Sequence, residues 1–542
     1  MTLFSHPTLP TLPLIGLLLL SRDHRRVLGF AVGSGCGSLR QVSGHDDVIP
    51  RRPIARSSTK TSTLAASFNP FSGLGKSVGS MLSGATGSVP VDFEDKAPSW
   101  EKLESMLEER QTPEERDMVA QRERGYGPTS ALANLRLFDA PEGTEPRVIL
   151  YRDHAAWCPY CEKVWLLLEE KRIPYRVEKV PMRCYGDKPS WFRKVSPSGA
   201  VPVANIDGRV ISESNVIMQV LEATFPDHNP LLPKPDSPLA SRVEPLLSLE
   251  REIFTAWFRW LTRSGQQSAA FEAAADKVDK ALKDGGGPYF LGKALSYVDL
   301  MYTPFLERMS ASLPYFKGLR VRGNPRWPNI DRWYDAMDTR EVYRGAKSDY
   351  YTHCHDLPPQ IGGCQVEAAG VPFKDEIDGK DGSWHLPLSA DGGLEPAGTA
   401  FFPDDLAKRL AAAKLVGNRK AVVPFALRGV GLPGVPPVMA ELADPNAKPN
   451  KDFAPPVDAA LRHVVHALLE GQEAAKATGL SQKNPVEQVQ LCLEYLRDRV
   501  GVPRDLPFAA ARQVSWSSLK PQCARAGWGR EFHVGSSEVH GV

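Results

Sequence analysis

Apolar and polar residues alternate with a regular rhythm between residues 147 and 226. Short apolar runs and two-residue alternation predict strands over 148–151, 175–180, 201–206 and 209–211. Helical spacing of apolar residues predicts helices that end near residue 171 and that cover 191–195 and 214–225. The last two strands flank Asp207-Gly208, a dipeptide typical of a tight hairpin turn. The predicted order of elements is therefore βαβαββα.

This order is the arrangement of a thioredoxin-like domain, which we place over 146–226. After a proline-rich linker, long amphipathic patterns predict an all-helical domain over 237–350. Inside it, Ser296 is followed by Asp299 at the spacing of a helix-start box. The predicted fold class is multidomain α/β plus all-α: a thioredoxin-like domain, an all-helical domain and a further, mostly helical C-terminal region.

The remaining segments show less regular patterns of apolar and polar residues. Residues 92–145 are charged and read as an N-terminal extension with one or two helices. Gly, Asp and Pro rise over 351–403, which predicts a linker. Helical spacing returns over 404–520, a C-terminal region whose role the pattern does not define.

The first 91 residues have the composition of a leader rather than of a folded domain. Arg, Ser, Thr and Gly are frequent, and the only acids before Asp92 are Asp23, Asp46 and Asp47. This composition is typical of an organellar transit peptide, for a plastid or another organelle, and we predict a soluble protein of the chloroplast stroma. The apolar run 12–20 is shorter than the ~20 residues that span a bilayer. The alternatives are a secretory signal with a disordered tail, a signal followed by a transit peptide, and disorder without a targeting role.

Composition narrows the classes of partner. The formal net charge is only +2, which argues against nucleic acid or an anionic membrane as a partner. The chain has 8 cysteines in 542 residues, without the spacing of a disulfide framework. A secreted protein held by disulfides is therefore disfavoured, and a reducing compartment with one redox pair fits better.

That pair is the turn Trp157-Cys158-Pro159-Tyr160-Cys161, which directly follows the first predicted strand and opens a helix. A thiol at a helix N-terminus faces unpaired backbone N–H groups and the positive end of the helix dipole. Both favour the thiolate, so Cys158 is the predicted nucleophile. Cys161 lies one turn further along, more buried, where it could close a disulfide with Cys158.

Two other interpretations of the pair are weaker. A structural zinc site takes four ligands, and no second Cys-x-x-Cys pair is present. A purely structural buried pair remains open, although the strand-turn-helix context argues against it.

Several separate motifs then resemble one family. They are the Cys-Pro-Tyr-Cys turn, Lys188-Pro189-Ser190-Trp191-Phe192, Gly199-Ala200-Val201-Pro202-Val203, Ile211-Ser212-Glu213-Ser214 and Tyr289-Phe290-Leu291-Gly292 with Ser296 and Asp299. Together residues 147–347 resemble a cysteine-containing glutathione S-transferase with a glutaredoxin-like centre. The two cysteines and the appended C-terminal region look most like the iota class of photosynthetic organisms, although that class usually has Trp where this chain has Tyr160.

The resemblance implies glutathione as the cosubstrate and assigns roles to particular residues. Pro202 would be the family's cis proline, turning the Val201 backbone toward glutathione. Glu213 and Ser214 would hold the γ-glutamyl end, and Lys188 would pair with the glycyl carboxylate. Tyr160 would lie beside the bound tripeptide. The group at Ser296 and Asp299 would be structural.

The resemblance also implies the chemistry. A cysteine in place of serine or tyrosine forms a mixed disulfide with glutathione, so the expected activity is thiol exchange through Cys158, resolved by a second glutathione or by Cys161. Candidate substrates are glutathionylated proteins, small glutathione adducts and dehydroascorbate. A conjugating transferase and a carrier of porphyrins or quinones are the alternatives. A homodimer is a further possibility.

Other groups carry weaker signals. Aromatic residues that could line an acceptor pocket also fit the helix-bundle core: Phe254, Trp257, Phe258, Trp260 and Tyr302. His353-Cys354-His355, with Cys364 nearby, has metal-ligand residue types. Adjacent ligands point apart in regular structure, however, so we predict an ordered loop there and no metal. Cys184 is predicted as a surface thiol, with a role as an alternative partner for glutathione left open. His463 and His466 are predicted as packing or solvated residues.

Overall fold

The structure is a computed structural model. It describes residues 95–263, 268–388, 393–396, 398–435, 440–471 and 486–517, all within the unit Thr86–Val542. The predicted leader over 1–91 lies outside the described residues.

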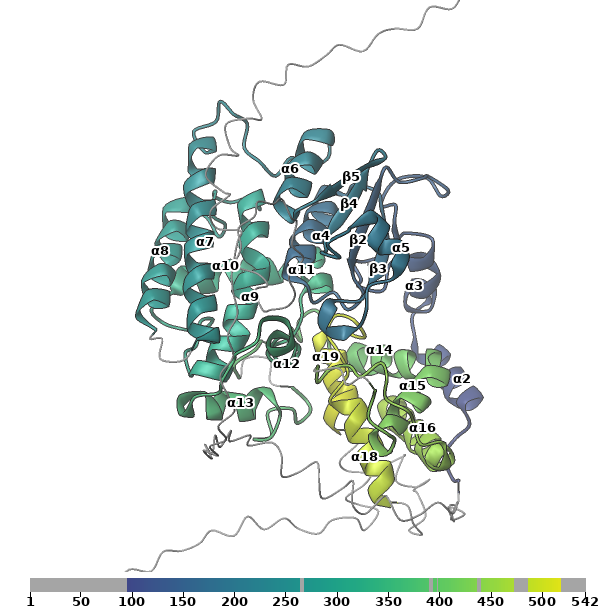
Figure 1. Cartoon of the computed structure of the whole chain (residues 1–542). Helices are drawn as coiled ribbons and strands as arrows, with labels where there is room; N and C mark the ends of the chain where they lie inside the picture. The colour runs from purple at the N-terminus through teal and green to yellow at the C-terminus, as the bar shows by residue number, and fades with distance from the viewer. Residues whose placement is uncertain are drawn as a thin grey trace, which may run out of the picture. The chain divides into compact units, whose positions relative to one another are not determined.

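A five-stranded sheet forms in the order β1-β3-β2-β4-β5 (Figure 1). Its strands are β1 (Leu135–Arg136), β2 (Val148–Asp153), β3 (Tyr175–Val180), β4 (Val203–Ile206) and β5 (Arg209–Ser212). β2 runs parallel to β3, with Val148 opposite Tyr175, and antiparallel to β4, with Val148 opposite Ile206. The parallel pair requires a crossover, which α4 (Pro159–Lys171) supplies. With α5 (Ser190–Val195) and α6 (Ser214–Thr224), the predicted thioredoxin-like arrangement is confirmed. β1, a two-residue edge strand, was not predicted.

α4 is buried along nearly its whole length, although its sequence is not apolar throughout. Five charged side chains are buried with it: Glu162, Lys163, Glu169, Glu170 and Lys171. Buried charges are tolerated when they are paired, and each of these side chains has an ion-pair or hydrogen-bond partner, such as Arg136 for Glu169 and Arg340 for Glu170. α4 therefore connects the sheet to the neighbouring helices through ion pairs as well as apolar contacts.

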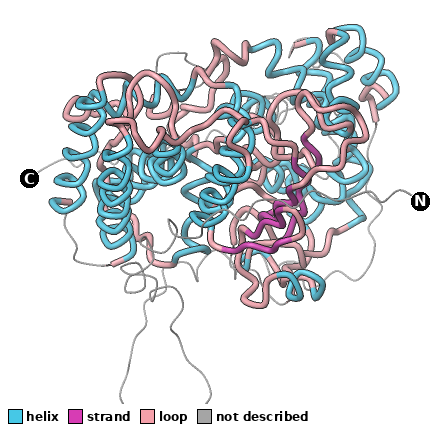
Figure 2. Tube along the Cα trace, turned by 90° about the horizontal axis from the view of Figure 1, so that it is seen from above, coloured by secondary structure: helices cyan, strands magenta, loops and turns pink. Residues whose placement is uncertain are grey.

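The helical part that follows is built around α9 (Tyr297–Lys317), in which every residue is buried. Its capping box forms as predicted: Asp299 Oδ2 accepts from the Ser296 backbone N–H at 2.9 Å. The other helices are α7 (Ala240–Thr262), α8 (Ala269–Gly285), α10 (Pro328–Asp338), α11 (Glu341–Ala346), α12 (Tyr350–Ile361) and α13 (Val371–Ile377). In Figure 2 the strands lie together with helices on both sides.

α12 and α13 lie inside the stretch 351–403 that was predicted as a linker, so the structure departs from the prediction there. The helix bears Pro358 and Pro359 near its C-terminal end, and these helix-breaking residues obscured the pattern. α12 is buried because it packs against α9. This stretch extends the all-helical core rather than leaving it.

A second apolar core holds the C-terminal helices together. They are α14 (Asp404–Gly417), α15 (Arg419–Ala426), α16 (Ala454–Glu470), α18 (Val486–Arg497) and α19 (Phe508–Arg512). α2 (Trp100–Arg110) belongs to this core through Leu103, Met106 and Leu107, and the Trp100 indole donates to Asp458 at 2.8 Å. α3 (Pro113–Glu123) connects α2 to the segment that carries β1.

Short 3₁₀ turns complete the list of elements: η2 (Arg183–Tyr185), η3 (Ala368–Gly370), η4 (Leu427–Val430) and η5 (Lys451–Phe453), with a π-helical turn η6 (Gln513–Ser517). Within the part of the chain that the structure describes, no helix is both long and apolar enough to cross a bilayer.

Candidate functional site

The predicted redox turn lies where a strand passes into a helix. β2 ends at Asp153, and Cys158 is the N-cap residue of α4, with Pro159 at the first helical position. Proline is favoured there because its missing N–H has no helical partner to lose. No side chain caps this helix start. The Cys158 thiol therefore lies at the positive end of the α4 dipole, where an anion is stabilised.

The two cysteines have different surroundings. Cys158 is 7% exposed and Cys161 is 1% exposed. Burial raises the pKa of the Cys161 thiol well above its ordinary value, and the hydrogen bond and charge of Cys158 add to that shift. The structure therefore disfavours Cys161 as a thiolate, which agrees with its predicted position behind the nucleophile.

Asp153, which the sequence analysis did not single out, lies beside both cysteines. Its carboxylate and the two Sγ atoms all fall within 4.8 Å of one another. Oδ2 accepts from the Trp157 backbone N–H at 2.7 Å, while Oδ1 is buried without a hydrogen-bond partner. A closed structural zinc site takes four ligands, and this group supplies three. The only available signal was its place at the end of the strand that leads into the turn.

The segment before β4 lies next to the nucleophile. The Val201-Pro202 peptide bond is cis, as the resemblance implied. Cys158 Sγ lies 4.0 Å from the Val201 carbonyl oxygen. The structure thus brings Cys158, Val201 and Pro202 together.

Glu213 and Ser214 lie at the start of α6. Glu213 is the exposed N-cap residue and has φ of 69°, a left-handed conformation that a non-glycine residue rarely adopts. Ser214 is buried at the first helical position. Strained backbone of this kind collects at binding and catalytic sites.

Lys188 is half-buried, and its ammonium donates to the Pro181 carbonyl. Burial lowers the pKa of Lys188, while the charges of Cys161, Cys158 and Asp153 oppose that shift. The predicted lysine therefore lies within electrostatic range of the redox pair.

Lys163, one turn beyond Tyr160 on α4, was missed by the sequence analysis. Its buried ammonium donates to Asn215 Oδ1 at 2.6 Å, which links α4 to α6. Burial lowers the pKa of Lys163 to about 8, and the charges of Glu250, Cys158 and others oppose it. A lysine buried near the turn is a cation that could stabilise a thiolate or an anionic ligand.

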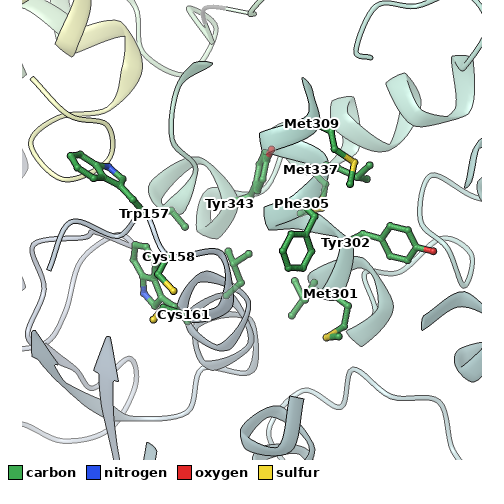
Figure 3. Packing of buried hydrophobic residues seen from close by; sticks show 14 of the residues in the cluster. Trp157, Cys158, Cys161, Met301, Tyr302, Phe305, Met309, Met337 and Tyr343 are labelled. Atoms are coloured by element: carbon green, nitrogen blue, oxygen red, sulfur yellow. The ribbon is translucent and has the colours of Figure 1, made fainter. Parts of the chain in front are cut away.

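An aromatic row starts at the redox turn. Tyr160 is 39% exposed, and its ring centroid lies 5.7 Å from that of Phe305. Phe305 contacts Phe254 at 4.9 Å, and Phe254 stacks on Phe258 at 5.9 Å. Figure 3 shows Phe305 on α9 opposite the start of α4. Half-buried Phe254 and Phe258 thus continue the aromatic row away from the redox turn.

The other aromatic candidates belong to the helix-bundle core, which was the alternative to a pocket. Trp257, Trp260 and Tyr302 are buried. The Trp257 indole donates to Ser312 at 3.0 Å, and the Tyr302 hydroxyl donates to the Leu246 carbonyl at 2.7 Å.

Arg308 of α9 holds the redox turn through hydrogen bonds. Its guanidinium donates to the Trp157 carbonyl at 2.7 Å and to Glu162 Oε2 at 2.9 Å. Burial and the charge of Glu307 raise the pKa of Glu162 to about 8, in spite of the nearby guanidinium. One arginine thus faces two buried carboxyl groups directly behind the redox turn.

The His353-Cys354-His355 group lies in α12 and not in the predicted loop. His353 is buried against Glu307 at 3.3 Å, and burial lowers the pKa of its imidazole to about 3. His355 instead lies between Asp378 and Glu441. The two histidines therefore point to different partners, as expected for neighbours in a helix.

The structure also bears on the predictions for Cys184 and for the two histidines of α16. Cys184 is half-buried rather than on the surface, and burial raises its pKa to about 12. His463 and His466 are buried packing residues of α16.

Two models of one family, one for each of its two domains, match this chain. The model "Glutathione S-transferase, N-terminal domain" matches residues 157–224, and "Glutathione S-transferase, C-terminal domain" matches residues 248–336. Glutathione S-transferase DHAR2 of Arabidopsis thaliana is 29% identical over 194 residues, which are 35% of this chain and 84% of that protein. Glutathione S-transferase L1 of the same plant is 30% identical over 195 residues, which are 35% of this chain and 79% of that protein.

Two solved structures are similar to part of this chain. Glutathione transferase Omega 3C from Trametes versicolor has 26% identity, with a TM-score of 0.32 over 38% of this chain and 91% of its own. Dehydroascorbate reductase from Chlamydomonas reinhardtii has 23% identity, with a TM-score of 0.32 over 38% of this chain and 94% of its own. Because the two halves match in order and the L1 relative aligns over most of its length, the chain belongs to the glutathione S-transferase family.

Proposed function

We propose that this protein is a glutathione-dependent thiol transferase that works through a mixed disulfide at Cys158. The observation that carries the proposal is the position of the Cys158 thiol at the uncapped start of α4, beside the Val201 carbonyl. A helix start stabilises the thiolate, which is the nucleophilic form. Glutathione is the family's cosubstrate, and a cysteine here forms a covalent bond with it.

The reaction has two exchanges. The Cys158 thiolate attacks the glutathione sulfur of a glutathionylated substrate, which forms the Cys158–glutathione disulfide and releases the substrate thiolate, which takes a proton. A second glutathione thiolate then attacks the glutathione sulfur of that mixed disulfide. This step releases oxidised glutathione and regenerates the Cys158 thiolate. One disulfide is thus exchanged for another: the substrate sulfur is reduced to a thiol, and the sulfur of the one incoming glutathione is oxidised.

The described geometry supports a location for glutathione. Its backbone would lie along Val201 and Pro202, next to the thiol. Its γ-glutamyl end would reach Glu213 and Ser214, because a carboxylate is stabilised at the α6 start and an ammonium pairs with a carboxylate. Lys188 would face the glycyl carboxylate.

Tyr160 would cover the tripeptide from the side of the aromatic row. Cys161 would then act, if at all, as an internal resolving thiol. Its raised pKa slows attack as a thiolate, so we propose that a second glutathione is the main route of resolution.

The names of several relatives suggest one substrate. Two of them are glutathione S-transferases DHAR2 and L1, and the similar Chlamydomonas reinhardtii protein is a dehydroascorbate reductase. We therefore propose dehydroascorbate alongside glutathionylated proteins and small glutathione adducts. We also propose the iota class, a chloroplast location, a homodimer, and the domain limits 146–226 and 237–350 for the two family domains.

The test is glutathione-dependent reduction of hydroxyethyl disulfide and, separately, of dehydroascorbate by the purified protein. Cys158→Ser should abolish both activities, while Cys161→Ser should retain most of the first. Cys364→Ser, which changes a thiol outside the turn, is the matched control and should remain active. A wild type that binds glutathione but reduces neither substrate would overturn the proposal, and loss in both turn variants would replace the monothiol route with a dithiol route.

A further inference from the structure

The C-terminal region reaches the redox turn through Trp157, the residue directly before Cys158. The Trp157 side chain is 1% exposed. Its indole N–H donates to the carbonyl of Val502 at 3.0 Å, a residue 345 positions further along the chain. Figure 3 shows the Trp157 ring pointing away from the cysteines toward the yellow ribbon of the C-terminal region.

The contact is more than one hydrogen bond. The Arg504 guanidinium lies over the indole, 4.8 Å from the ring centroid, in cation–π range. Gly501 packs against the edge of the indole. A Cβ atom on Gly501 would lie 2.5 Å from Trp157 Cζ2. Gly501, Val502 and Arg504 of one loop thus contact the edge, the N–H and the face of a single side chain.

The loop itself is held in place through the backbone of Val502 and through Arg504. The Val502 carbonyl also accepts from the Ser348 hydroxyl, and the Val502 N–H donates to Thr352 Oγ1 at 3.3 Å. Arg504 is fixed by Asp505 at 2.7 Å. We name residues 498–505 the clamp loop.

The backbone of Trp157 is fixed as firmly as its side chain. Its N–H donates to Asp153 at 2.7 Å, and its carbonyl accepts from Arg308 at 2.7 Å. That carbonyl belongs to the peptide group whose nitrogen is the N of Cys158. A displacement of the Trp157 side chain that is large enough to strain these hydrogen bonds would therefore shift the backbone that sets the direction of the Cys158 thiol.

We propose that the clamp loop is a positioning element of the active site, so that the C-terminal region sets the orientation and reactivity of Cys158 through Trp157. This inference gives the residues beyond the two family domains a role in the reaction, and it rests on the proposed function only for its activity readout. The loop touches neither thiol, so it acts through Trp157 and is not itself catalytic.

Gly501→Ala is the direct test, because its new Cβ displaces the indole. Gly429→Ala is the matched control, since a Cβ there would lie 2.5 Å from the Leu491 carbonyl oxygen and 2.9 Å from Tyr495 Cβ. It crowds the same C-terminal region without meeting Trp157. Trp157→Phe, which keeps a ring but removes the N–H donor, tests the same contact if Gly501→Ala does not fold.

The readouts are the pH dependence of Cys158 alkylation by iodoacetamide, followed on its peptide by mass spectrometry, and kcat/KM for hydroxyethyl disulfide. We expect Gly501→Ala and Trp157→Phe to change the alkylation profile and to lower kcat/KM about tenfold, mainly through kcat, as misplacement of a reacting group does. Gly429→Ala should leave both unchanged in the fraction that folds.

Equal effects of Gly501→Ala and Gly429→Ala would overturn the proposal, because general loss of stability would then explain both. Unchanged alkylation in both test variants would overturn it as well. Alkylation does not require turnover, so failure of the thiol transferase assay in the wild type is distinguishable from failure of the clamp.

Discussion

Two buried glutamates on α4 should respond in opposite ways to the same substitution. Glu162 is 4% exposed; Oε2 accepts from Arg308, while Oε1 has no hydrogen-bond partner. Burial and the charge of Glu307 raise its pKa to about 8, against an ordinary 4.5. The folded protein therefore holds a proton that the unfolded chain releases above about pH 4.5.

The sign of the pH effect follows from that difference. Since the folded state binds the extra proton, the free energy of unfolding falls as pH rises from the unfolded to the folded pKa of Glu162. Each pH unit in that window costs about 1.4 kcal/mol. Glu162→Gln imitates the protonated carboxyl and removes this cost. The variant should gain about 2–3 kcal/mol relative to the wild type between pH 5 and pH 7.

Glu169 on the same helix is the control. Its carboxylate accepts from the Arg136 guanidinium at 2.8 and 2.9 Å, from the Thr129 hydroxyl at 2.8 Å and from the Tyr175 hydroxyl at 2.6 Å. In Glu169→Gln the new amide N–H₂ faces these donors, and the buried guanidinium loses its counter-charge. We expect a loss of about 3–5 kcal/mol at pH 7.

Urea unfolding followed by circular dichroism at pH 5, 6, 7 and 8, at constant ionic strength, measures both effects. A stability difference between Glu162→Gln and wild type that stays constant from pH 5 to pH 7 would refute the reasoning. A stabilised Glu169→Gln would show that hydrogen-bond satisfaction does not distinguish these two sites.

Three further outcomes are expected. Lys163→Met removes a cation near Cys158 and should slow iodoacetamide alkylation of that thiol at pH 6 about three- to tenfold; an unchanged rate would mean that the ammonium does not act on the thiol. Burial raises the pKa of Cys492 to about 12, so at pH 7 it should be alkylated about 100-fold more slowly than Cys158, and similar rates by peptide mass spectrometry would contradict this. Arg512→Met breaks the buried 2.6 Å pair with Asp349 and should cost about 3–5 kcal/mol in urea unfolding, with partial recovery on adding Asp349→Asn; a cost below about 1 kcal/mol would show that the pair contributes little.

The parts of the fold that could be predicted depend on interactions between neighbours in sequence. Asp299 completes the capping box of a helix whose N-cap residue, Ser296, lies three positions earlier, and Pro159 fits the helix start beside Cys158. Such local chemistry is visible in the order of residues. α12 was missed because its burial comes from α9, while Pro358 near its end suggested a break.

The candidate site divides in the same way. Cys158 and the Val201-Pro202 segment were found because their residue types and context carry the signal. Arg308 and Lys163 were not, since a charged residue in a helical pattern is usually solvated. Their importance depends on packing between α4, α6 and α9, which spacing along one helix does not reveal.

The membership of α2 in the C-terminal core has a consequence for synthesis on the ribosome. Trp100 must wait for Asp458, which is translated 358 residues later. At about 5–20 residues per second, roughly 20–70 s pass before that partner emerges. For most of that interval Leu103, Met106 and Leu107 lack the core residues that the C-terminal helices supply. The nascent chain therefore exposes the apolar face of α2, the kind of surface that chaperones bind.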